Sequence, residues 1–596
     1  MSSAPSRLAA ALGDLCSGLI PLIGIAWVAG MPQWLGTTWL DGQILPICIG
    51  LGTAAALLKA PYRNAAGALE VVLAAAAIAS WFWSAINYDA WLISFADREP
   101  AQWGPGLIAL LLTLEAMRKA CGLAITLLVW AFIVYALFGD ALGGFAAAAP
   151  QSATEITLYL YADSQGVPGF IVRVVLTLVL AFVVLGKIME LSGVTRLFTD
   201  LAMRLMAHRR GGAAKVSIVA SSAFGMVSGS TVGNVMSTGL VTIPLMKRSG
   251  IPAPIAAAVE AVASNGGQLA PPVMGATAFL IAEFLQISYR EVVVAAAVPA
   301  LLYFVVLFVQ IDAIAKRLGL TGSTEQQGPS FVALCRDNWP LLIPIVALLV
   351  LLFGFELNAA RAALAAAGLL LVLSGIRDRS ALAPRRLGEI LRGSGENLLP
   401  ILLIGAGAGV VVGVLNSSGL GFQLSIALAT LGQNLGLLAM LVLTALLSIV
   451  LGMGMPTAAV YLVLSVVLAP ALVEFGVQPL AAHLFLFYFG VLSMLTPPVA
   501  VASFVAAGLA ETSFWRTSAA ALKLAAVAYL IPFVWIYNPA VILDGSAPSI
   551  VIAVVLAGIA GMLLARGLAA APGQRLLGYV QIAGALAVGL VIALIA

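Results

Sequence analysis

The chain of 596 residues is 62% hydrophobic and carries only 29 Lys plus Arg and 25 Asp plus Glu, which is 9% charged residues. Because a soluble protein has roughly 25% charged residues, this composition excludes a soluble enzyme and predicts an all-α polytopic membrane protein. The net charge of +4 is too small for nucleic-acid binding, and four cysteines without CxxC spacing and two histidines do not favour a disulfide scaffold, a zinc site or a cofactor site.

Apolar stretches of spanning length predict about fifteen transmembrane helices. Two further segments are broken by Gly, Ser and Pro and predict re-entrant hairpins. In chain order we expect a helical scaffold region at 1–104, linking and scaffold helices at 105–192, a first repeat core at 193–290 with a hairpin at 217–246 and a broken helix at 253–286, scaffold helices at 291–396, a second repeat core at 397–512 with a hairpin at 435–474 and a broken helix at 480–510, and C-terminal helices at 513–596.

Lys and Arg cluster after alternate spans, and these clusters predict the cytoplasmic side. All of these clusters fall on the cytoplasmic side if each hairpin returns to the side of the membrane from which it entered. This topology places the N-terminus inside and the C-terminus outside. Residues 193–212 and 384–396 alternate apolar and basic faces and predict two surface helices in the headgroup zone.

The chain contains an internal repeat with an offset of 226 residues. The matching features are helix breakers and small polar residues rather than apolar fillers. They are Ser192-Gly193 with Ser418-Gly419, Thr231 with Thr457, Pro244 with Pro470, and Pro271-Pro272-Val273 with Pro497-Pro498-Val499. An odd number of expected crossings separates the copies, so the pattern predicts an inverted repeat, the architecture of secondary transporters. A duplication kept only for packing is the alternative.

The first hairpin is rich in hydroxyl and amide side chains, in the stretch from Ser221 to Asn234. Glycine lets the backbone leave helical geometry, and polar groups at membrane depth must then find partners or line a cavity. We therefore expect substrate or cation contacts at Ser228, Gly229, Ser230, Thr231 and Asn234. For Ser221 and Ser222, close packing of small residues is an equally good interpretation.

The segments 264–272 and 493–498 predict breaks in the two helices that follow the hairpins. Two glycines and two prolines within 264–272 cannot sustain an α-helix. A half-helix that ends there offers carbonyl groups to a cation, and one that starts there offers N–H groups to a carboxylate. The candidate residues in the first break are Asn265, Gly267, Gln268 and Pro271. In the second copy they are Thr496 in the broken helix and Gly454 and Thr457 in the hairpin.

Glu260 is the most informative single residue. It lies in the apolar run Ala-Ala-Val-Glu-Ala-Val-Ala, one turn before the expected break at 264–272. An acidic residue inside a membrane segment is a candidate for ion or proton coupling, and burial and a nearby helix C-terminus would both disfavour its charged form. A structural hydrogen bond or a basic partner is the alternative.

Several long motifs resemble one transporter family. SGSTVGNVMSTG, TIPLMKRSG, AVEAVASNGGQLAPPVMGA and AFLIAEF, between Ser221 and Phe284, and GMGMPTAAVYL and SMLTPPVAVASF in the second copy look like the permease of tripartite ATP-independent periplasmic (TRAP) transporters, of the TAXI subgroup. The resemblance covers roughly residues 105–540. Residues 1–104 match by hydropathy and position the small membrane subunit of these systems, here fused in one chain.

The resemblance implies an elevator mechanism in the bacterial inner membrane, in which hairpins and broken helices move as a unit against a scaffold. A periplasmic binding protein would deliver a small organic carboxylate, and a sodium or proton gradient would drive import. Substrate contacts are then expected at Ser228, Gly229, Ser230, Thr231, Gln268, Pro271 and Thr496. Coupling is expected at Glu260, Asn234, Asn265, Gly267, Gly454 and Thr457, and sodium would be bound among Ser230, Asn234, Asn265, Gly267, Gly454, Thr457 and Thr496.

Three alternatives remain at this point. The first is an ion-coupled carboxylate transporter that works without a binding protein. A membrane-embedded hydrolase would need a nucleophile and a base, and the sequence has no GxSxG or HExxH motif. A channel needs no moving inverted unit, and the twin breaks argue against it.

Overall fold

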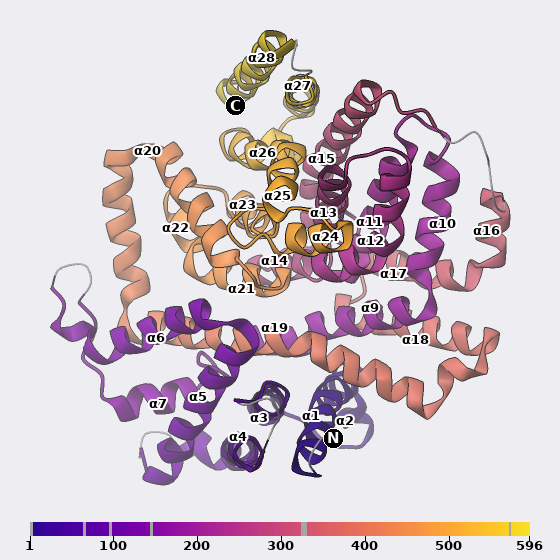
Figure 1. The fold of residues 1–596 in the computed structure, drawn as a ribbon. Helices are drawn as coiled ribbons and strands as arrows, with labels where there is room; N and C mark the ends of the chain where they lie inside the picture. Colours follow the sequence, from indigo (N-terminus) through magenta and orange to yellow (C-terminus); the bar gives the residue numbers. More distant parts are fainter. Residues whose placement is uncertain are drawn as a thin grey trace. The chain divides into compact units, whose positions relative to one another are not determined.

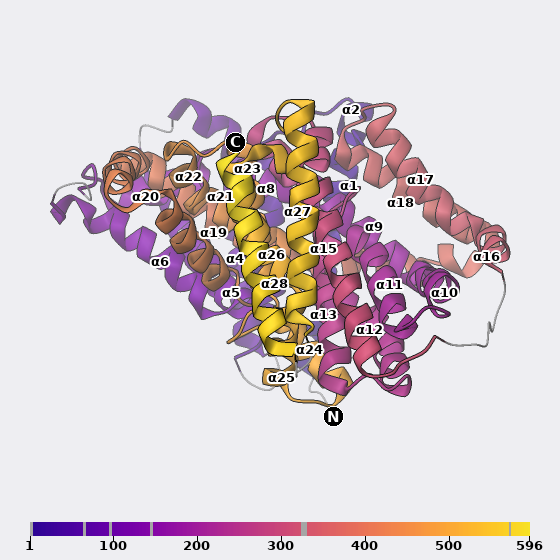
Figure 2. The same ribbon diagram turned by 90° about the horizontal axis from the view of Figure 1, so that it is seen from above.

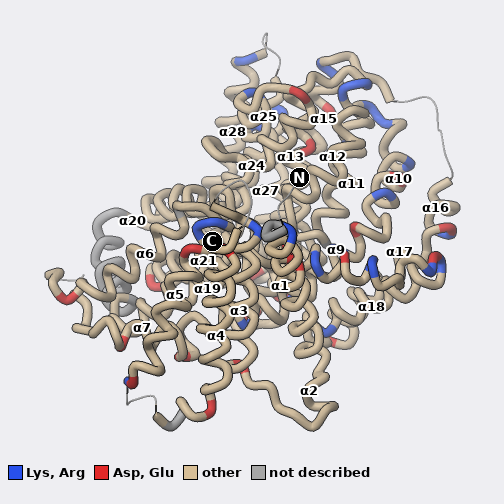
Figure 3. Tube along the Cα trace, turned by 60° about the horizontal axis from the view of Figure 1, so that its bottom comes forward, with Lys and Arg blue, Asp and Glu red and all other residues tan. Residues whose placement is uncertain are grey.

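The computed structural model describes residues 4–62, 67–94, 98–143, 147–322, 330–570 and 574–595, with side chains described except at 4–6, 92, 93, 124, 227 and 421–435. Within these ranges every regular element is a helix, as the composition predicts. The described chain contains nine helices that are long and apolar enough to cross a membrane, or up to eleven when two bent pairs are counted as spans. Figure 3 shows charged residues mainly at helix ends and in connecting segments.

Four of the about fifteen expected spans are not among these eleven. Two of them, 253–286 and 480–510, are helices that the structure breaks in the middle. The other two are α5 (Pro100–Cys121), which contains Gln102 and Glu115, and α6 (Leu123–Phe138), which has 16 residues.

The chain forms two compact units, of which the first comprises Met1–Ile188, Phe355–Leu437 and Leu462–Phe475. It contains α1 (Ala4–Val28), α2 (Met31–Trp34), α3 (Asp41–Lys59), α4 (Ala68–Ser94), α5, α6, η2 (Gly139–Ala141), α7 (Ala153–Ala162), α8 (Phe170–Val174), the π-helix η4 (Val175–Val179), most of α9 (Leu180–Ser192), α18 (Ala359–Arg377), η5 (Arg379–Leu382), α19 (Pro384–Ser418), the start of α20 (Leu420–Gly452), the end of α21 (Thr457–Val467) and α22 (Ala469–Glu474) (Figure 1).

The second unit comprises Met189–Gly354, Leu438–Tyr461 and Gly476–Ala596. Its further helices are α10 (Val194–Met206), α11 (Gly212–Ser228), α12 (Thr231–Arg248), α13 (Ala253–Leu269), α14 (Thr277–Leu285), α15 (Tyr289–Arg317), α16 (Phe331–Asp337), α17 (Trp339–Phe353), α23 (Pro479–Leu492), α24 (Val501–Ala510), α25 (Phe514–Leu524), α26 (Ala526–Tyr537), η6 (Pro539–Ile542), α27 (Ala547–Leu568) and α28 (Arg575–Leu594).

In the first unit the N-terminal helices pack on the long helix α19. α1 contacts both α3 and α19. A charged cluster joins the three helices: Lys59 lies 2.6 Å from Asp14 and 2.5 Å from Glu396, and Arg392 lies 2.9 Å from Asp14. Residues 1–104 are thereby attached to a helix far along the chain, since Lys59 and Glu396 are 337 positions apart.

In the second unit α11, α12 and α13 pack against one another, and α24 and α25 pack on α13. α15 contacts α27, and α27 and α28 run side by side, as Figure 2 shows. The helices α11–α14 and α23–α25, which hold most of the candidate residues, therefore belong to one compact unit.

One expected surface helix is wrong. Residues 384–396 are the first part of α19, a continuous helix of 35 residues that runs through Pro400 and ends at the left-handed Gly419. The buried residues of α19 begin at Ile390, so part of the predicted surface segment packs inside the unit. Residues 193–212 do contain a separate amphipathic helix, α10, which begins after Gly193.

The repeat offset of 226 is visible in the backbone. Gly193 and Gly419 both have positive φ, 84° and 75°, where each ends the preceding helix. Thr231 and Thr457 each begin a helix, and the Pro271-Pro272 and Pro497-Pro498 bonds are both cis. The two copies therefore share their breaks at equivalent positions.

Candidate functional site

The first hairpin turns at Gly229 and Ser230, between α11 and α12. Gly229 has φ 63°, a conformation that favours glycine. The Ser230 hydroxyl accepts a hydrogen bond from the N–H of Gly233 (3.1 Å) and so caps α12. The hairpin thus has a sharp turn followed at once by a new helix N-terminus.

Glycines let this hairpin lie directly on α13 and its break. A Cβ added to Gly267 would lie 2.9 Å from the Cα of Gly225, and one added to Gly275 would lie 2.8 Å from the Cα of Gly229. The N–H of Gly275 donates to the carbonyl of Met226 at 2.8 Å. The hairpin is therefore in backbone contact with α13 at Gly267 and with the break at Gly275.

The first break is shorter than the sequence predicts. α13 continues through Ser264, Asn265 and Gly267 to Leu269, and the non-helical segment is 270–276. Paired glycines remain helical here because they face close neighbours: Gly266 meets the Tyr303 ring and Gly267 meets Gly225. Glu260 consequently lies nine residues before the end of α13. Helix-end electrostatics act within the last turn, so the expected effect of a helix C-terminus on Glu260 is wrong.

Glu260 is fully buried and is surrounded by hydroxyl groups from three helices. Ser217 and Thr242 donate to Oε2, at 2.7 and 2.5 Å. Ser221, Thr238 and Ser264 donate to Oε1, at 2.7, 2.6 and 3.1 Å. We call these six residues the Glu260 cluster.

The Glu260 cluster satisfies the carboxylate without a basic residue. Lys215, on α11, pairs instead with Asp312 of α15 at 2.8 Å. A carboxylate offers about four lone-pair sites, and the five hydroxyls, three at Oε1 and two at Oε2, are enough to occupy them. A protonated Glu260 would have to donate to one of these oxygens, so at least one hydroxyl would turn away from it.

Three predicted site residues carry buried polar atoms that have no hydrogen-bond partner among the described residues. They are the Ser228 hydroxyl at the hairpin tip, the side-chain N–H₂ of Asn265 in α13, and the Thr457 hydroxyl at the start of α21. A buried polar group without a partner costs free energy. These three atoms are therefore free to contact a bound ion, water or substrate.

Other predicted residues in the first copy are engaged with the protein. Asn234 donates to the carbonyl of Ser221 at 2.6 Å, and its Oδ1 lies 3.1 Å from the Thr238 hydroxyl oxygen. Gln268 donates to the Thr231 hydroxyl at 2.6 Å, and that hydroxyl lies 3.3 Å from Asn265 Oδ1. Asn234 therefore ties α11 to α12, whereas Thr231, Asn265 and Gln268 form one polar group.

Pro271 lies in the break itself and is half-buried, directly after the last residues of α13. Gly267 contributes close packing to the site, since even a methyl group there would meet the backbone of α11. Ser230 is exposed at the hairpin tip, where its hydroxyl already serves as the helix cap.

In the second copy the break at 493–500 is held by side-chain hydroxyls. Ser493 donates to the carbonyl of Gly490 at 2.6 Å and also lies 2.9 Å from the carbonyl of Gly452. Thr496 bonds to the carbonyl of Leu492 at 2.8 Å and to the Tyr529 hydroxyl at 2.7 Å. Gly454, with φ 79°, lies in the turn before Thr457.

The two copies meet within the second unit. α14 packs against α23, and the ring of Phe284 lies 6.0 Å from Tyr461 and 6.4 Å from His483. The Tyr461 hydroxyl and His483 Nδ1 are 2.6 Å apart in a buried pair. Both breaks thus lie in the same compact unit.

Sequence reasoning missed three members of the Glu260 cluster: Ser217, Thr238 and Thr242. A usable signal was present, because each helix carries a polar pair at i, i+4 in an apolar setting. The pairs are Ser217 with Ser221, Thr238 with Thr242, and Glu260 with Ser264. Residues four apart share a helix face, so three such pairs in successive helices predict one polar cluster.

Comparison with known proteins identifies the family. The family model described as "Tripartite ATP-independent periplasmic transporter, DctM component" matches residues 108–550. A putative TRAP transporter large permease protein of Haemophilus influenzae is 25% identical over 61% of this chain and 84% of its own length.

Two further relatives have named substrates. The C4-dicarboxylate TRAP transporter large permease protein DctM of Pseudomonas aeruginosa is 26% identical over 66% of this chain and 89% of its own length. The 2,3-diketo-L-gulonate TRAP transporter large permease protein YiaN of Escherichia coli is 25% identical over 61% of this chain and 84% of its own length. With a match over well over half of its length, the chain belongs to the DctM family of TRAP transporter large permeases, which are multi-pass proteins of the bacterial inner membrane and not enzymes.

Proposed function

We propose that this protein imports a small organic carboxylate that a periplasmic binding protein delivers, and that a sodium or proton gradient drives import through an elevator movement. The observation that carries the proposal is the set of unpartnered buried polar atoms at Ser228, Asn265 and Thr457, beside two helix breaks in one compact unit. Such breaks are where secondary transporters bind substrate and coupling ions.

The substrate class is supported by the relatives and by the site. Relatives are named for a C4-dicarboxylate and for 2,3-diketo-L-gulonate. In this chain α12 begins at Thr231 and α14 at Thr277, each directly after a break. The free N–H groups of helix N-termini favour carboxylates, and Ser228, Gly229, Ser230, Thr231, Gln268, Pro271 and Thr496 are the proposed contacts.

We assign residues 1–104 to a fused small subunit and the chain to the TAXI subgroup. The family match begins at residue 108, so the N-terminal helices lie outside it. They pack on α19 through the Lys59, Asp14, Glu396 and Arg392 cluster. In this proposal they form a scaffold against which the helices of the second unit move.

For the coupling ion we propose a proton carried by Glu260, with sodium at the breaks as the competing arrangement. Five hydroxyls already fill the carboxylate's lone pairs, so a sodium ion would have to displace one of them. A proton needs only the rotation of one hydroxyl. The sodium arrangement would use Asn265, Gly267, Gly454 and Thr457, with Ser230, Asn234 and Thr496 as further ligands.

Uptake into proteoliposomes tests the proposal. The purified protein is reconstituted, and a radiolabelled C4-dicarboxylate is added with and without the candidate binding protein, under an inward sodium gradient, a pH gradient or neither. We expect accumulation only when binding protein and one gradient are both present. Accumulation without binding protein would instead support the stand-alone transporter, and equilibration that no gradient drives would support a channel.

A further inference from the structure

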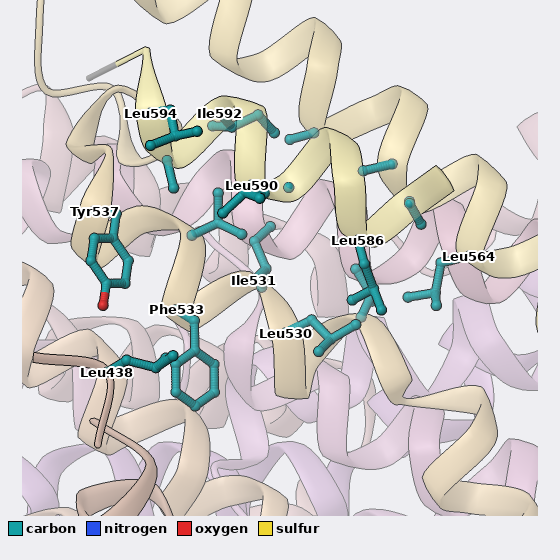
Figure 4. A pocket seen from close by; sticks show the side chains of 18 residues that line it. Leu438, Leu530, Ile531, Phe533, Tyr537, Leu564, Leu586, Leu590, Ile592 and Leu594 are labelled. Carbon is teal, nitrogen blue, oxygen red and sulfur yellow. The ribbon is translucent and has the colours of Figure 1, made fainter. Parts of the chain in front are cut away.

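A cavity of about 460 Å³ lies in the second unit between α26, α27 and α28, with Leu438 of α20 at one side (Figure 4). Its lining is aliphatic and aromatic, and Tyr537 alone among the lining residues carries a polar side-chain atom. α27 and α28 contribute eleven of the 18 lining residues, and residues 551–596 lie beyond the part of the chain that matches the DctM family.

The cavity opens at the surface of the unit. Leu590 and Leu594, which line it, are 63% and 75% exposed, and Leu438 is 57% exposed. The outer face of α27 is also apolar and exposed, for example at Val555. In a multi-pass membrane protein such a surface faces the hydrocarbon of the bilayer, so the neighbours of the opening are lipid tails.

An apolar cavity of this kind is unfavourable both when it is empty and when it is filled with water. A cavity without polar partners does not hold ordered water, and its lining loses dispersion contacts when nothing fills it. It is roughly three times the size of an engineered apolar cavity of about 150 Å³ that binds benzene, and its size falls within the range of small-molecule sites.

Two arginines lie at the end of the helix pair where α27 ends and α28 begins. Leu564, near the end of α27, lines the cavity, and Arg566 follows two residues later. Arg575 begins α28 at the same end of the helix pair, ten residues before Ala585, the first residue of that helix that lines the cavity, and both arginines are exposed. Guanidinium groups pair well with phosphate. We propose that the cavity binds one acyl chain of a membrane phospholipid whose phosphate contacts Arg566 and Arg575.

The bound chain would support the second helix break. Phe533 lines the cavity, and its ring lies 5.4 Å from Phe485 and 5.7 Å from Phe489 of α23. One turn earlier on α26, Tyr529 bonds to Thr496 in the break. The cavity is thus one side chain away from the helix that ends at this break. The binding site itself does not depend on the proposed transport function.

Photo-crosslinking tests the proposal. The full-length protein is reconstituted into vesicles of phosphatidylethanolamine and phosphatidylglycerol that contain a phosphatidylethanolamine with a diazirine on one acyl chain. After irradiation, mass spectrometry maps the labelled residues. We expect labelling at Leu530 and Leu590 to exceed labelling at Val551, which is exposed on α27 but does not line the cavity.

Gly589→Leu is the variant that fills the cavity. A Cβ at Gly589 meets only Val534 Cγ2, at 3.9 Å, so the new side chain can enter without moving the backbone. The matched control is Gly558→Leu, on α27, where a Cβ has no neighbour within 4 Å and which does not line the cavity. We expect labelling at Leu530 to fall about tenfold in Gly589→Leu, the factor given by the loss of about two buried methylene groups, and to stay unchanged in Gly558→Leu.

Several results would overturn the assignment. One is labelling at Leu530 and Leu590 no denser than at Val551, and another is equal labelling in the two glycine variants. If Gly589→Leu does not fold, Ala560→Leu fills the cavity from the opposite wall and must give the same loss. Labelling by a diazirine fatty acid but not by the phospholipid, or an unchanged signal in Arg566→Gln with Arg575→Gln, would contradict the phospholipid headgroup.

Discussion

The two repeats share their breaks but differ in what lies between them. Glu260 and four hydroxyl residues of its cluster are matched, 226 positions later, by five leucines. Ser217, Ser221, Thr238, Thr242 and Glu260 correspond in this order to Leu443, Leu447, Leu464, Leu468 and Leu486, and Ser264 corresponds to Gly490. Both breaks contain a cis Pro-Pro pair at equivalent positions, Pro271-Pro272 and Pro497-Pro498, although the second break begins three residues earlier relative to the offset.

This difference shows that a hairpin packed on a broken helix forms without a buried carboxylate, and that the Glu260 cluster is an additional feature of the first copy. Leu486 is fully buried, as Glu260 is, so the second copy occupies the same position with an apolar side chain. Burying a carboxylate is costly even when it is hydrogen-bonded, whereas leucine packing stabilises a core directly. The Glu260 cluster is therefore a feature of the first copy beyond what a hairpin against a broken helix requires.

The largest loss of stability is expected for Glu260→Leu, which gives the first copy the residue found at the equivalent position of the second. The variant places the residue of the second copy among five hydroxyls that lose this acceptor. Thr238 and Thr242 keep backbone carbonyls at 2.9 and 3.1 Å, whereas Ser217 and Ser264 keep no other acceptor among the described residues. Each unsatisfied buried donor costs about 1–3 kcal/mol. We expect the free energy of unfolding to fall by about 3 kcal/mol or more, measured by denaturant titration of the purified protein in detergent. The matched control, Leu486→Met, conserves volume and should cost less than about 1.5 kcal/mol. Equal losses in both variants would mean that the cluster contributes nothing particular.

A smaller loss is expected where the hairpin touches α13. Gly267→Ala places a Cβ 2.9 Å from the Cα of Gly225, so the two helices must separate. Such overpacking costs about 1–3 kcal/mol, and transport should be lost with it. The control is Gly508→Ala in α24, where nothing lies within 4 Å of the new Cβ. If Gly267→Ala melts and transports like wild type, the close contact of hairpin and break is not as described.

The smallest effect on stability is expected at Thr457. Its buried hydroxyl has no described partner, so Thr457→Val removes no hydrogen bond and should change the free energy of unfolding by less than about 0.5 kcal/mol. If the hydroxyl is a cation ligand, the cation concentration for half-maximal uptake rises about tenfold. Thr517→Val is the control, since that hydroxyl is also buried and unpartnered but lies in α25, outside the breaks. Identical cation dependence in both variants would remove Thr457 from the site.

Much of this fold follows from composition and from residues that break helices. Long apolar runs predict the helices, and the repeated Pro-Pro pairs predict the breaks, because the restrictions on proline are local. The start of the first break was not predictable, because Gly266 and Gly267 stay helical through contacts with Tyr303 and Gly225. These neighbours lie tens of residues away in sequence, and tertiary packing overrides local propensity.

In the candidate site, too, some features were predictable from the sequence and others depend on tertiary packing. Glu260 stands out in sequence as a charge in an apolar run, but its five partners come from three helices, and only their i, i+4 spacing hints at a common face. Asn234 has the same side chain as Asn265, yet the first is fully engaged and the second is not. Residue type and position alone could not distinguish a structural amide from one that is free for a ligand.

The measurement that tests the account most directly compares accumulation with exchange in Glu260→Gln. The amide keeps the size of the side chain and fixes a neutral form. We predict that the reconstituted variant still exchanges radiolabelled carboxylate across the membrane but no longer accumulates it under a pH gradient, because it cannot carry a proton. Loss of accumulation under a sodium gradient alone would indicate that Glu260 balances a bound sodium ion. A variant that accumulates substrate at the wild-type level under both gradients would contradict any coupling role for Glu260 and leave its cluster as a structural feature.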